Sequence, residues 1–319
     1  MLLTMARRYA ALGLAFLVGL GGITAASAQT YGLATMQPGT LNHTTGTAIA
    51  KVLKEKGGMN ALVQPTAGES VLIPLVGRGE AEIGIANALE VKVATDGGKL
   101  PDLRLIGAIH PLPTAFFVRK DSGMKTMGDL KGKRVVFGFS AMRVLDVVAR
   151  AMLATGGLTE KDILPVLVPN VIRGADDFVG GSADTFYFAF GAPKVREVDA
   201  TVGGLRALEV PESGMEAARK IYADGYLAPA TPGPFYIGVE RPMGVYTWDN
   251  LLFTSARVKD DVVYNMIDAM AKNKDDLVAV QPALRAFTPA GLYKTSDVPY
   301  HPGALKYFAD NKIDAKSTQ

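Results

Sequence analysis

The sequence predicts an α/β fold in which two lobes, each a mostly parallel sheet flanked by helices, enclose a cleft. Short apolar runs alternate with helical patterns along the chain, the order expected of parallel strands joined by crossover helices. The chain after residue 28 is also too long for one core, because single cores stop growing near ~250–300 residues. We expect the first lobe to comprise residues 29–115 and 246–319, and the second lobe residues 116–245.

In the first lobe we expect strands at 31–36, 61–65 and 81–86. A helix follows the first strand, because Ala48, Ile49, Val52 and Leu53 fall on one helical face and Gly57-Gly58 then ends the pattern. A shorter helix is expected at 70–76. After the second lobe, the chain returns with a strand at 248–254 and helices at 260–271 and 303–311.

The second lobe repeats this organisation. Strands are expected at 103–109 and 115–119 on the way into it, then at 132–138, 163–168 and 184–190. A long helix is predicted over 141–153, because its apolar residues recur at helical spacing, and another over 173–179. The crossover segments 113–120 and 228–246 would then form a hinge, and the cleft between two such lobes is a typical ligand site.

The N-terminus resembles a cleavable signal peptide. Arg7 and Arg8 precede an apolar stretch over 9–20, and Ala26-Ser27-Ala28 supplies the small residues of a cleavage site. The alternative is a retained anchor, but the stretch is shorter than the ~20 residues that a spanning helix needs. We expect cleavage after Ala28 and a periplasmic location for the soluble, monomeric mature chain.

Composition narrows the function further. The chain has no cysteine, which excludes disulfides, thiolate metal sites and a lipid-modified cysteine anchor. Its three histidines, His43, His110 and His301, have no metal-ligand spacing. Without residues 1–28 the net charge is +1, so no nucleic-acid partner is expected. No phosphate-binding loop or dinucleotide fingerprint is present, and we expect no cofactor.

The turn at 37–45 is the first candidate for ligand contact. It joins a strand to a helix and carries Thr40, Asn42, His43 and Thr44 beside the free N–H groups of a helix N-terminus, which favour anions. No acidic residue occurs from residue 31 to residue 54. The alternative is that Asn42 or Thr44 only caps the helix.

Two further strand-to-helix turns supply candidates in the first lobe. Thr66 and Ser70 offer hydroxyl groups, and Gly68 between them allows the backbone to approach a ligand closely. The neighbouring Glu69 is interpreted as part of a capped helix start. Asn87, at the end of the third strand, either contacts a ligand or begins a turn.

In the second lobe, Ser140 and Arg143 follow a strand where the long helix is expected to begin. An arginine in the first turn of a helix opposes the helix dipole, so we expect Arg143 to pair with a ligand carboxylate. The alternative is a solvated surface arginine. Tyr187 and Gly191 are further candidates, although strand alternation leaves the face of Tyr187 undecided.

Ser140 also allows a second hypothesis, a serine hydrolase. The strand-turn-helix context is similar to a nucleophile elbow, but Met142 stands where that turn requires glycine. His301 is the only downstream candidate for the base. A binding function is therefore favoured over an enzyme.

Taken together, several segments resemble the TAXI family of TRAP transporter receptors. They are Pro38-Gly39-Thr40, GEAEIGIA at 79–86, DLKGKRV at 129–135, the segment 184–193, and PYHPGA at 299–304. The resemblance implies a type II periplasmic binding protein, a two-lobed Venus flytrap that hands its solute to a TRAP membrane permease. It implies a glutamate-like amino acid or another carboxylate as the ligand.

The chain departs from that family at 140–143, where Ser-Ala-Met-Arg replaces a glycine-containing stretch. Arg143 adds a charge there, so a dicarboxylate or other organic anion fits the pattern as well as an amino acid. By the same resemblance, His301 belongs to a C-terminal docking segment rather than to the ligand site. A periplasmic sensing module for a membrane sensor is the alternative to a transport receptor.

Overall fold

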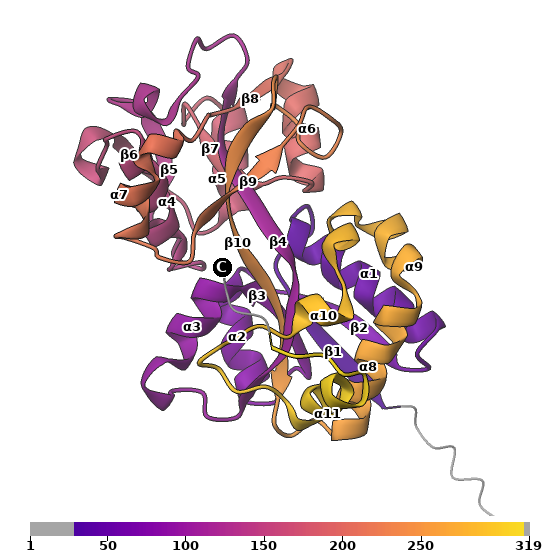
Figure 1. Cartoon of the computed structure of the whole chain (residues 1–319). Coiled ribbons are helices and arrows are strands. Elements are labelled where there is room, and N and C mark those ends of the chain that lie inside the picture. The colour runs from indigo at the N-terminus through magenta and orange to yellow at the C-terminus, as the bar shows by residue number, and fades with distance from the viewer. Residues whose placement is uncertain (1–28, 316–319) are drawn as a thin grey trace, which may run out of the picture.

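The computed structural model describes residues 29–315, and the predicted signal peptide lies outside them. The fold is α/β with two lobes, as predicted (Figure 1). Two long strands, β4 (Leu103–Arg119) and β10 (Met243–Ser255), pair antiparallel and run from one lobe into the other. Within the described residues, the strand order of the main sheet is β2-β1-β3-β10-β4-β7, with β8 beside β4 and β9 beside β10.

The first lobe is built on three parallel strands. β1 lies between β2 and β3, and β10 closes this part of the sheet antiparallel to β3. Helices cover both faces (Figure 1). The elements are β1 (Thr30–Thr35), β2 (Asn60–Pro65), β3 (Ile83–Asn87), α1 (Leu41–Glu55), α2 (Glu69–Gly77), α3 (Ala88–Thr95), α8 (Asp260–Lys272), α9 (Lys274–Val280), α10 (Pro289–Leu292) and α11 (Pro302–Asp310).

The second lobe repeats the plan. β5 pairs parallel with β6, a parallel bridge joins Val135 to Thr185 just before β7, and β4 lies antiparallel to β7 and β8. The elements are β5 (Arg134–Phe137), β6 (Leu164–Leu167), β7 (Phe186–Ala189), β8 (Leu205–Ala207), β9 (Tyr226–Ala230), α4 (Leu145–Thr155), α5 (Val171–Val179), α6 (Pro193–Val202) and α7 (Met215–Arg219). Short 3₁₀ turns occur at Asp96–Gly98, Met127–Leu130, Glu160–Asp162, Glu212–Gly214 and Pro282–Ala286.

The expected break between strands at 103–109 and 115–119 is wrong, because β4 continues through Pro111 and Pro113. Prolines interrupt a strand only where their missing N–H is needed in the ladder. Here both prolines stay in register with β10, opposite Asp249 and Thr247, and a bulge lies beside them. The predicted lobe boundaries at 115/116 and 245/246 fall inside β4 and β10 and stay a prediction.

Side-chain alternation along the strands separates the buried side chains into two clusters. Leu33 and Ala34 are neighbours on β1, yet Leu33 belongs to the cluster that includes residues of α1, α8 and α11, whereas Ala34 belongs to the cluster that extends into the second lobe. The predicted apolar face of α1 is confirmed, because Ala48, Ile49 and Val52 are fully buried against β1 and its neighbours. None of the helices between residues 29 and 315 is long and apolar enough to cross a membrane.

Candidate functional site

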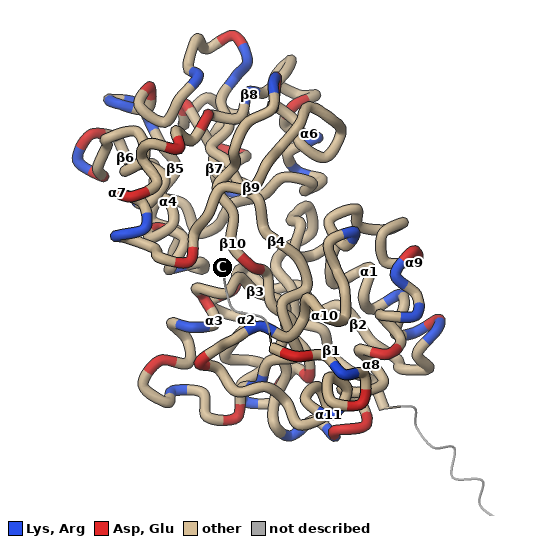
Figure 2. Tube along the Cα trace, in the orientation of Figure 1, with Lys and Arg blue, Asp and Glu red and all other residues tan. Residues whose placement is uncertain are grey.

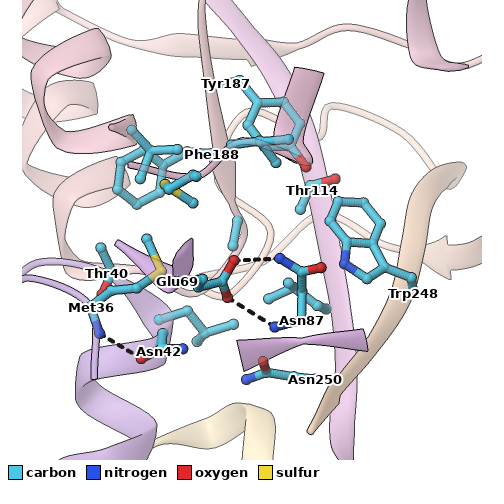
Figure 3. A pocket seen from close by; sticks show the side chains of 16 residues that line it. Met36, Thr40, Asn42, Glu69, Asn87, Thr114, Tyr187, Phe188, Trp248 and Asn250 are labelled. Atoms are coloured by element: carbon cyan, nitrogen blue, oxygen red, sulfur yellow. Dashed lines mark hydrogen bonds between the residues drawn. The ribbon is translucent and has the colours of Figure 1, made fainter. Parts of the chain in front are cut away.

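A cavity lies between the lobes, beside the two long strands that join them. It contains about 440 Å³ of empty space, part of it open to solvent. Side chains from the first lobe, the second lobe and the connecting strands all contribute to its wall (Figure 3). They are Met36, Thr40, Leu41, Asn42, Glu69, Asn87, Leu112, Thr114, Met142, Leu145, Val171, Tyr187, Phe188, Ala189, Trp248 and Asn250.

The wall is mostly apolar, and its polar groups are few and specific. Among the described residues that line it, none is lysine, arginine or histidine. Its one carboxyl group belongs to Glu69. Lysine, arginine, aspartate and glutamate residues are spread along the backbone of both lobes (Figure 2). A cavity of this kind suits a small ligand with an apolar part and a few hydrogen-bonding groups.

Glu69 begins α2 and is buried, with 2% of its surface exposed. Its carboxyl oxygens accept hydrogen bonds from Asn87, one from the backbone N–H at 2.9 Å and one from the side-chain amide (Figure 3). Burial, followed by the nearby charge of Glu90, raises the pKa of Glu69 to about 8, against the opposing effect of the Asn87 hydrogen bonds. A cation that would pair with this carboxyl group is missing from the cavity lining.

Glu90 links the lobes behind that wall. Its backbone N–H donates to Asn87 Oδ1 at 2.9 Å, which caps α3, and its carboxyl group accepts a hydrogen bond from the Ser70 hydroxyl. The other carboxyl oxygen accepts from the backbone N–H of Val144 in the second lobe at 3.2 Å. Burial raises the pKa of Glu90, and hydrogen bonds from Ser70 and Val144 oppose that shift. Glu90 is therefore tied to both lobes.

The lobes are in contact on two sides of the cavity. On one side, the Ser70 backbone N–H donates to the Ala141 carbonyl at 3.2 Å, and the Arg143 N–H donates to Ser70 Oγ at 3.0 Å. On the other side, the Lys194 N–H donates to the Gly39 carbonyl at 3.0 Å. Backbone atoms meet so closely that a Cβ on Gly68 would lie 2.2 Å from the Ala141 carbonyl oxygen. The structure is therefore a closed arrangement of the two lobes.

Buried polar residues organise the part of the wall that comes from β4 and β10. His110 is buried, and burial lowers its pKa to about 4, so its ring is neutral. Its Nδ1 lies 2.7 Å from the Pro111 carbonyl and must be the protonated nitrogen, since a carbonyl only accepts. Its Nε2 therefore accepts, and Thr45 Oγ1 and the Asn250 side-chain nitrogen lie 3.2 Å and 3.4 Å from it.

Four of the predicted ligand residues line the cavity: Thr40, Asn42, Asn87 and Tyr187. Thr40, rather than Asn42 or Thr44, caps α1, because its Oγ1 accepts from the His43 N–H at 3.1 Å. The Asn42 amide accepts from the Met36 N–H at 2.9 Å and donates to the Ile85 carbonyl at 2.7 Å. Both polar atoms of the Asn42 side chain are therefore hydrogen-bonded to backbone groups in, or directly after, the strands that shape the cavity.

The other first-lobe candidates lie outside the cavity lining. His43 is half-buried, and burial lowers its pKa. Thr44 Oγ1 donates within its own helix and accepts from Gln281 at 2.6 Å, and Thr66 Oγ1 donates to the Thr35 carbonyl at 2.9 Å. Gly68 and Ser70 form the contact with the second lobe described above.

In the second lobe, Ser140 and Arg143 are exposed, and neither lines the cavity. The predicted helix over 141–153 begins later, at Leu145, so Arg143 is not in a helical turn. Residues 140–144 instead form turns, and their backbone groups are used to contact the first lobe. Gly191 has a φ of +75°, which favours glycine, and its N–H donates to the Phe235 carbonyl at 3.0 Å; neither residue lines the cavity.

His301 is fully buried, and both of its ring nitrogens contact the backbone. Nδ1 accepts from the Gly303 N–H at 3.1 Å and caps α11, which leaves Nε2 as the donor to the Val258 carbonyl at 3.0 Å. No nitrogen is left to activate a serine, and Ser140 does not contact it. The geometry therefore gives no support to the hydrolase hypothesis.

Most of the cavity lining was missed from the sequence. Trp248, Asn250, Leu112 and Thr114 lie on strands whose inward face periodicity alone does not identify. Glu69 was considered only as part of a helix start, and it does begin α2, but its side chain turns into the cavity (Figure 3). The available signal was a lone acidic residue directly after a turn glycine, at the start of a helix whose residues after Ser70 are all apolar.

Residues 33–311 match the model of the NMT1-like family. Three solved structures with the same fold are similar over most of the chain. A protein described as a periplasmic transporter has 15% identity and a TM-score of 0.57, covering 90% of this chain and 94% of that one. PhnD1 from Prochlorococcus marinus MIT 9301, in complex with methylphosphonate, has 9% identity and a TM-score of 0.56, covering 90% and 100%.

The third is the alkanesulfonate-binding protein SsuA from Xanthomonas axonopodis pv. citri, bound to MOPS. It has 15% identity and a TM-score of 0.51, covering 89% of this chain and 94% of that one. At these identities the similarity is one of fold, that of two-lobed periplasmic binding proteins.

Proposed function

The chain belongs to the NMT1-like family, and from this premise we propose that it is a periplasmic receptor that captures a small solute between its lobes and delivers it to a membrane transporter. The observation that carries the proposal is the interlobe cavity. Residues from both lobes and from the connecting strands line it, so neither lobe forms the site alone. Opening of the lobes would expose the site, and closure would bury the solute.

The connections between the lobes suit such a movement. The first lobe and the second lobe are joined through β4 and β10, and their other direct hydrogen bonds include the backbone contacts at Gly39 and Ser70. Rotation about the two strands would break these contacts, while the strand pairing within each lobe is kept. Hinge closure of two domains around a ligand is a common way to couple binding to a change of shape. A transporter can then recognise the closed, loaded receptor.

The partner that we propose is a TRAP-type permease, on the resemblance of segments 184–193 and 299–304 to TAXI receptors. The carboxylate ligand that the same resemblance implied stays a prediction, and the cavity does not favour it. Arg143, the expected partner of a carboxylate, is exposed outside the lining. Export depends on residues 1–28, which resemble a signal peptide.

Thermal unfolding of the mature chain in the presence of a library of small solutes tests the proposal. A solute that binds only the native state adds RT ln(1 + [L]/Kd) to its stability, about 2.7 kcal/mol at a hundredfold excess over Kd. At least one solute should raise the melting temperature in a saturable way. Failure of every solute in a broad library would count against a receptor function.

Co-purification from membranes separates the two possible partners. A transport receptor should be retained by detergent-solubilised permease in a solute-dependent manner. Retention by a sensor kinase and not by a permease would instead support the sensing module.

A further inference from the structure

Three polar atoms in the cavity wall have no hydrogen-bond partner among the described residues. They are Nε1 of Trp248, a donor, Oδ1 of Asn250, an acceptor, and the hydroxyl of Tyr187, which can donate or accept. Trp248 and Asn250 are 99% buried on β10, and Tyr187 is 98% buried on β7. Leaving a buried polar atom unpaired is costly, so each calls for a complementary group on whatever fills the cavity.

The orientation of the Asn250 amide follows from His110. The Nε2 atom of His110 accepts, so the Asn250 group that faces it at 3.4 Å must be the NH₂ group. That choice turns Oδ1 away from His110, and Figure 3 shows this oxygen on the side of Asn87. The wall at this point therefore offers an acceptor, and a ligand must bring an N–H or O–H donor to it.

Trp248 supplies the opposite chemistry. An indole N–H only donates, and in Figure 3 the indole nitrogen lies on the edge of the ring that faces Asn87. A ligand must bring an acceptor, such as a carbonyl oxygen, to this position. The two unpaired atoms on β10 would therefore be satisfied by a donor and an acceptor on the same small molecule, and the Tyr187 hydroxyl can pair with either kind of group.

The rest of the wall excludes a full negative charge. The carboxyl group of Glu69 faces the cavity, and lysine, arginine and histidine are missing from the described lining. A ligand carboxylate would be desolvated beside another acid with no cation to offset it, and burial of an unpaired anion is strongly unfavourable. Met36, Leu112 and Phe188 provide apolar surface for the remainder of the ligand.

We infer that the solute is an uncharged molecule with an amide-type group, whose carbonyl oxygen accepts from Trp248 and whose N–H donates to Asn250. This inference rests on the proposed function and names the ligand class of the same cavity. It departs from the carboxylate that the family resemblance implies. An amide combines both groups on adjacent atoms, whereas an amine lacks the acceptor and a carboxylate lacks the donor.

Matched sets of acid, amide and amine on one carbon skeleton provide the test. We would use isovalerate, isovaleramide and isopentylamine, together with benzoate, benzamide and benzylamine, at about pH 7 where the acids and amines are charged. Thermal shifts identify binding, and calorimetry gives Kd. An amide should bind at least ~tenfold more tightly than its acid and its amine, since each alternative leaves a buried group unpaired.

Two variants connect any binding to the proposed contacts. Trp248→Phe keeps an aromatic ring but removes the N–H donor, and Asn250→Ala removes the acceptor. Each should weaken amide binding by about threefold to tenfold, the worth of one neutral hydrogen bond. The matched control is Tyr246→Phe, which deletes a buried, unpartnered hydroxyl from the same strand but outside the cavity lining. Melting of each ligand-free variant reports whether it is folded.

The outcomes are distinguishable. An acid or an amine that binds as tightly as its amide overturns the inference, as does amide binding that neither variant weakens. If the wider library yields only anionic ligands, the inference fails while the proposed receptor function stands. If no compound of any class binds, both fail.

Discussion

Replacement of Glu69 by glutamine should change how the stability of this protein depends on pH. Glu69 is buried in the interlobe cavity, and burial raises its pKa from 4.5 to about 8. The folded protein therefore holds a proton that the unfolded chain releases near pH 4.5. Since the folded state binds more protons, the free energy of unfolding falls as the pH rises toward and through 8.

The size of the effect follows from that pKa. The stabilisation relative to the ionised group is fully present below pH 4.5 and is lost as the pH passes through the folded-state pKa. Between about pH 6.5 and pH 8, the proton on Glu69 should account for a loss of ~1.6 kcal/mol of unfolding free energy. The buried His110, with a pKa lowered from 6.5 to about 4, acts with the opposite sign, mainly below pH 6.5, and its contribution is the same in the wild type and in a Glu69 variant.

Glu69→Gln removes this pH-dependent loss of unfolding free energy, but it also lowers the stability by an amount that does not depend on pH. Both carboxyl oxygens of Glu69 accept hydrogen bonds from Asn87, and the amide nitrogen of a glutamine would meet one of these donors. Such an unpaired buried contact costs ~1–3 kcal/mol at every pH. The informative quantity is therefore the difference between the pH slopes, not the stability at one pH.

Urea unfolding of the wild type and of Glu69→Gln at several pH values between 6.5 and 8 measures that difference. The wild-type free energy should fall by ~1.6 kcal/mol more than that of the variant across the window. Glu55→Gln, at an exposed position on α1, is the control and should keep the wild-type slope. Parallel curves for the wild type and Glu69→Gln would refute a protonated Glu69.

Three further predictions concern closure, capping and charge. Gly68→Ala should weaken solute binding by ~tenfold or more, because the new Cβ would lie 2.2 Å from the Ala141 carbonyl oxygen in the closed form. The control is Gly128→Ala, whose new Cβ would have no neighbouring atom nearer than 3.5 Å, and calorimetry should show that it binds solute normally. Thr40→Ala removes the N-cap of α1 and should lower the unfolding free energy by ~1 kcal/mol, and an unchanged urea midpoint would contradict that role. Arg143→Ala should change the affinity for solute by less than ~twofold, because an exposed charge outside the cavity lining contributes little to binding. A large loss of affinity would show that the Arg143 side chain contacts the solute.

The fold class could be predicted from the sequence because the apolar periodicity and the turn residues indicated the same helices and strands. The apolar face of α1 and the glycines after it predicted a helix that the structure confirms. The continuity of β4 was not accessible, because two prolines predict a break and only the partner strand β10 holds them in the ladder. The start of α4 was also missed, since residues 140–144 take their conformation from contacts with the other lobe.

Only those site residues that lie in the turns after strands could be predicted from the sequence. Thr40, Asn42 and Asn87 follow strands and line the cavity as expected of strand-to-helix turns. Trp248 and Asn250 lie within a long strand, where alternation says that every second side chain shares a face but not which face meets the ligand. Their role depends on the packing of β10 against β4 and β3, which distant segments decide.

Closure of the lobes on a solute is the central claim, and a distance measurement across the cleft tests it most directly. The chain has no cysteine, so Lys99→Cys and Glu216→Cys would place one spin label on each lobe at exposed positions and nowhere else. Addition of a solute that raises the melting temperature should shift the distance distribution between the labels to shorter, narrower values. An identical distribution with and without saturating solute would contradict the account.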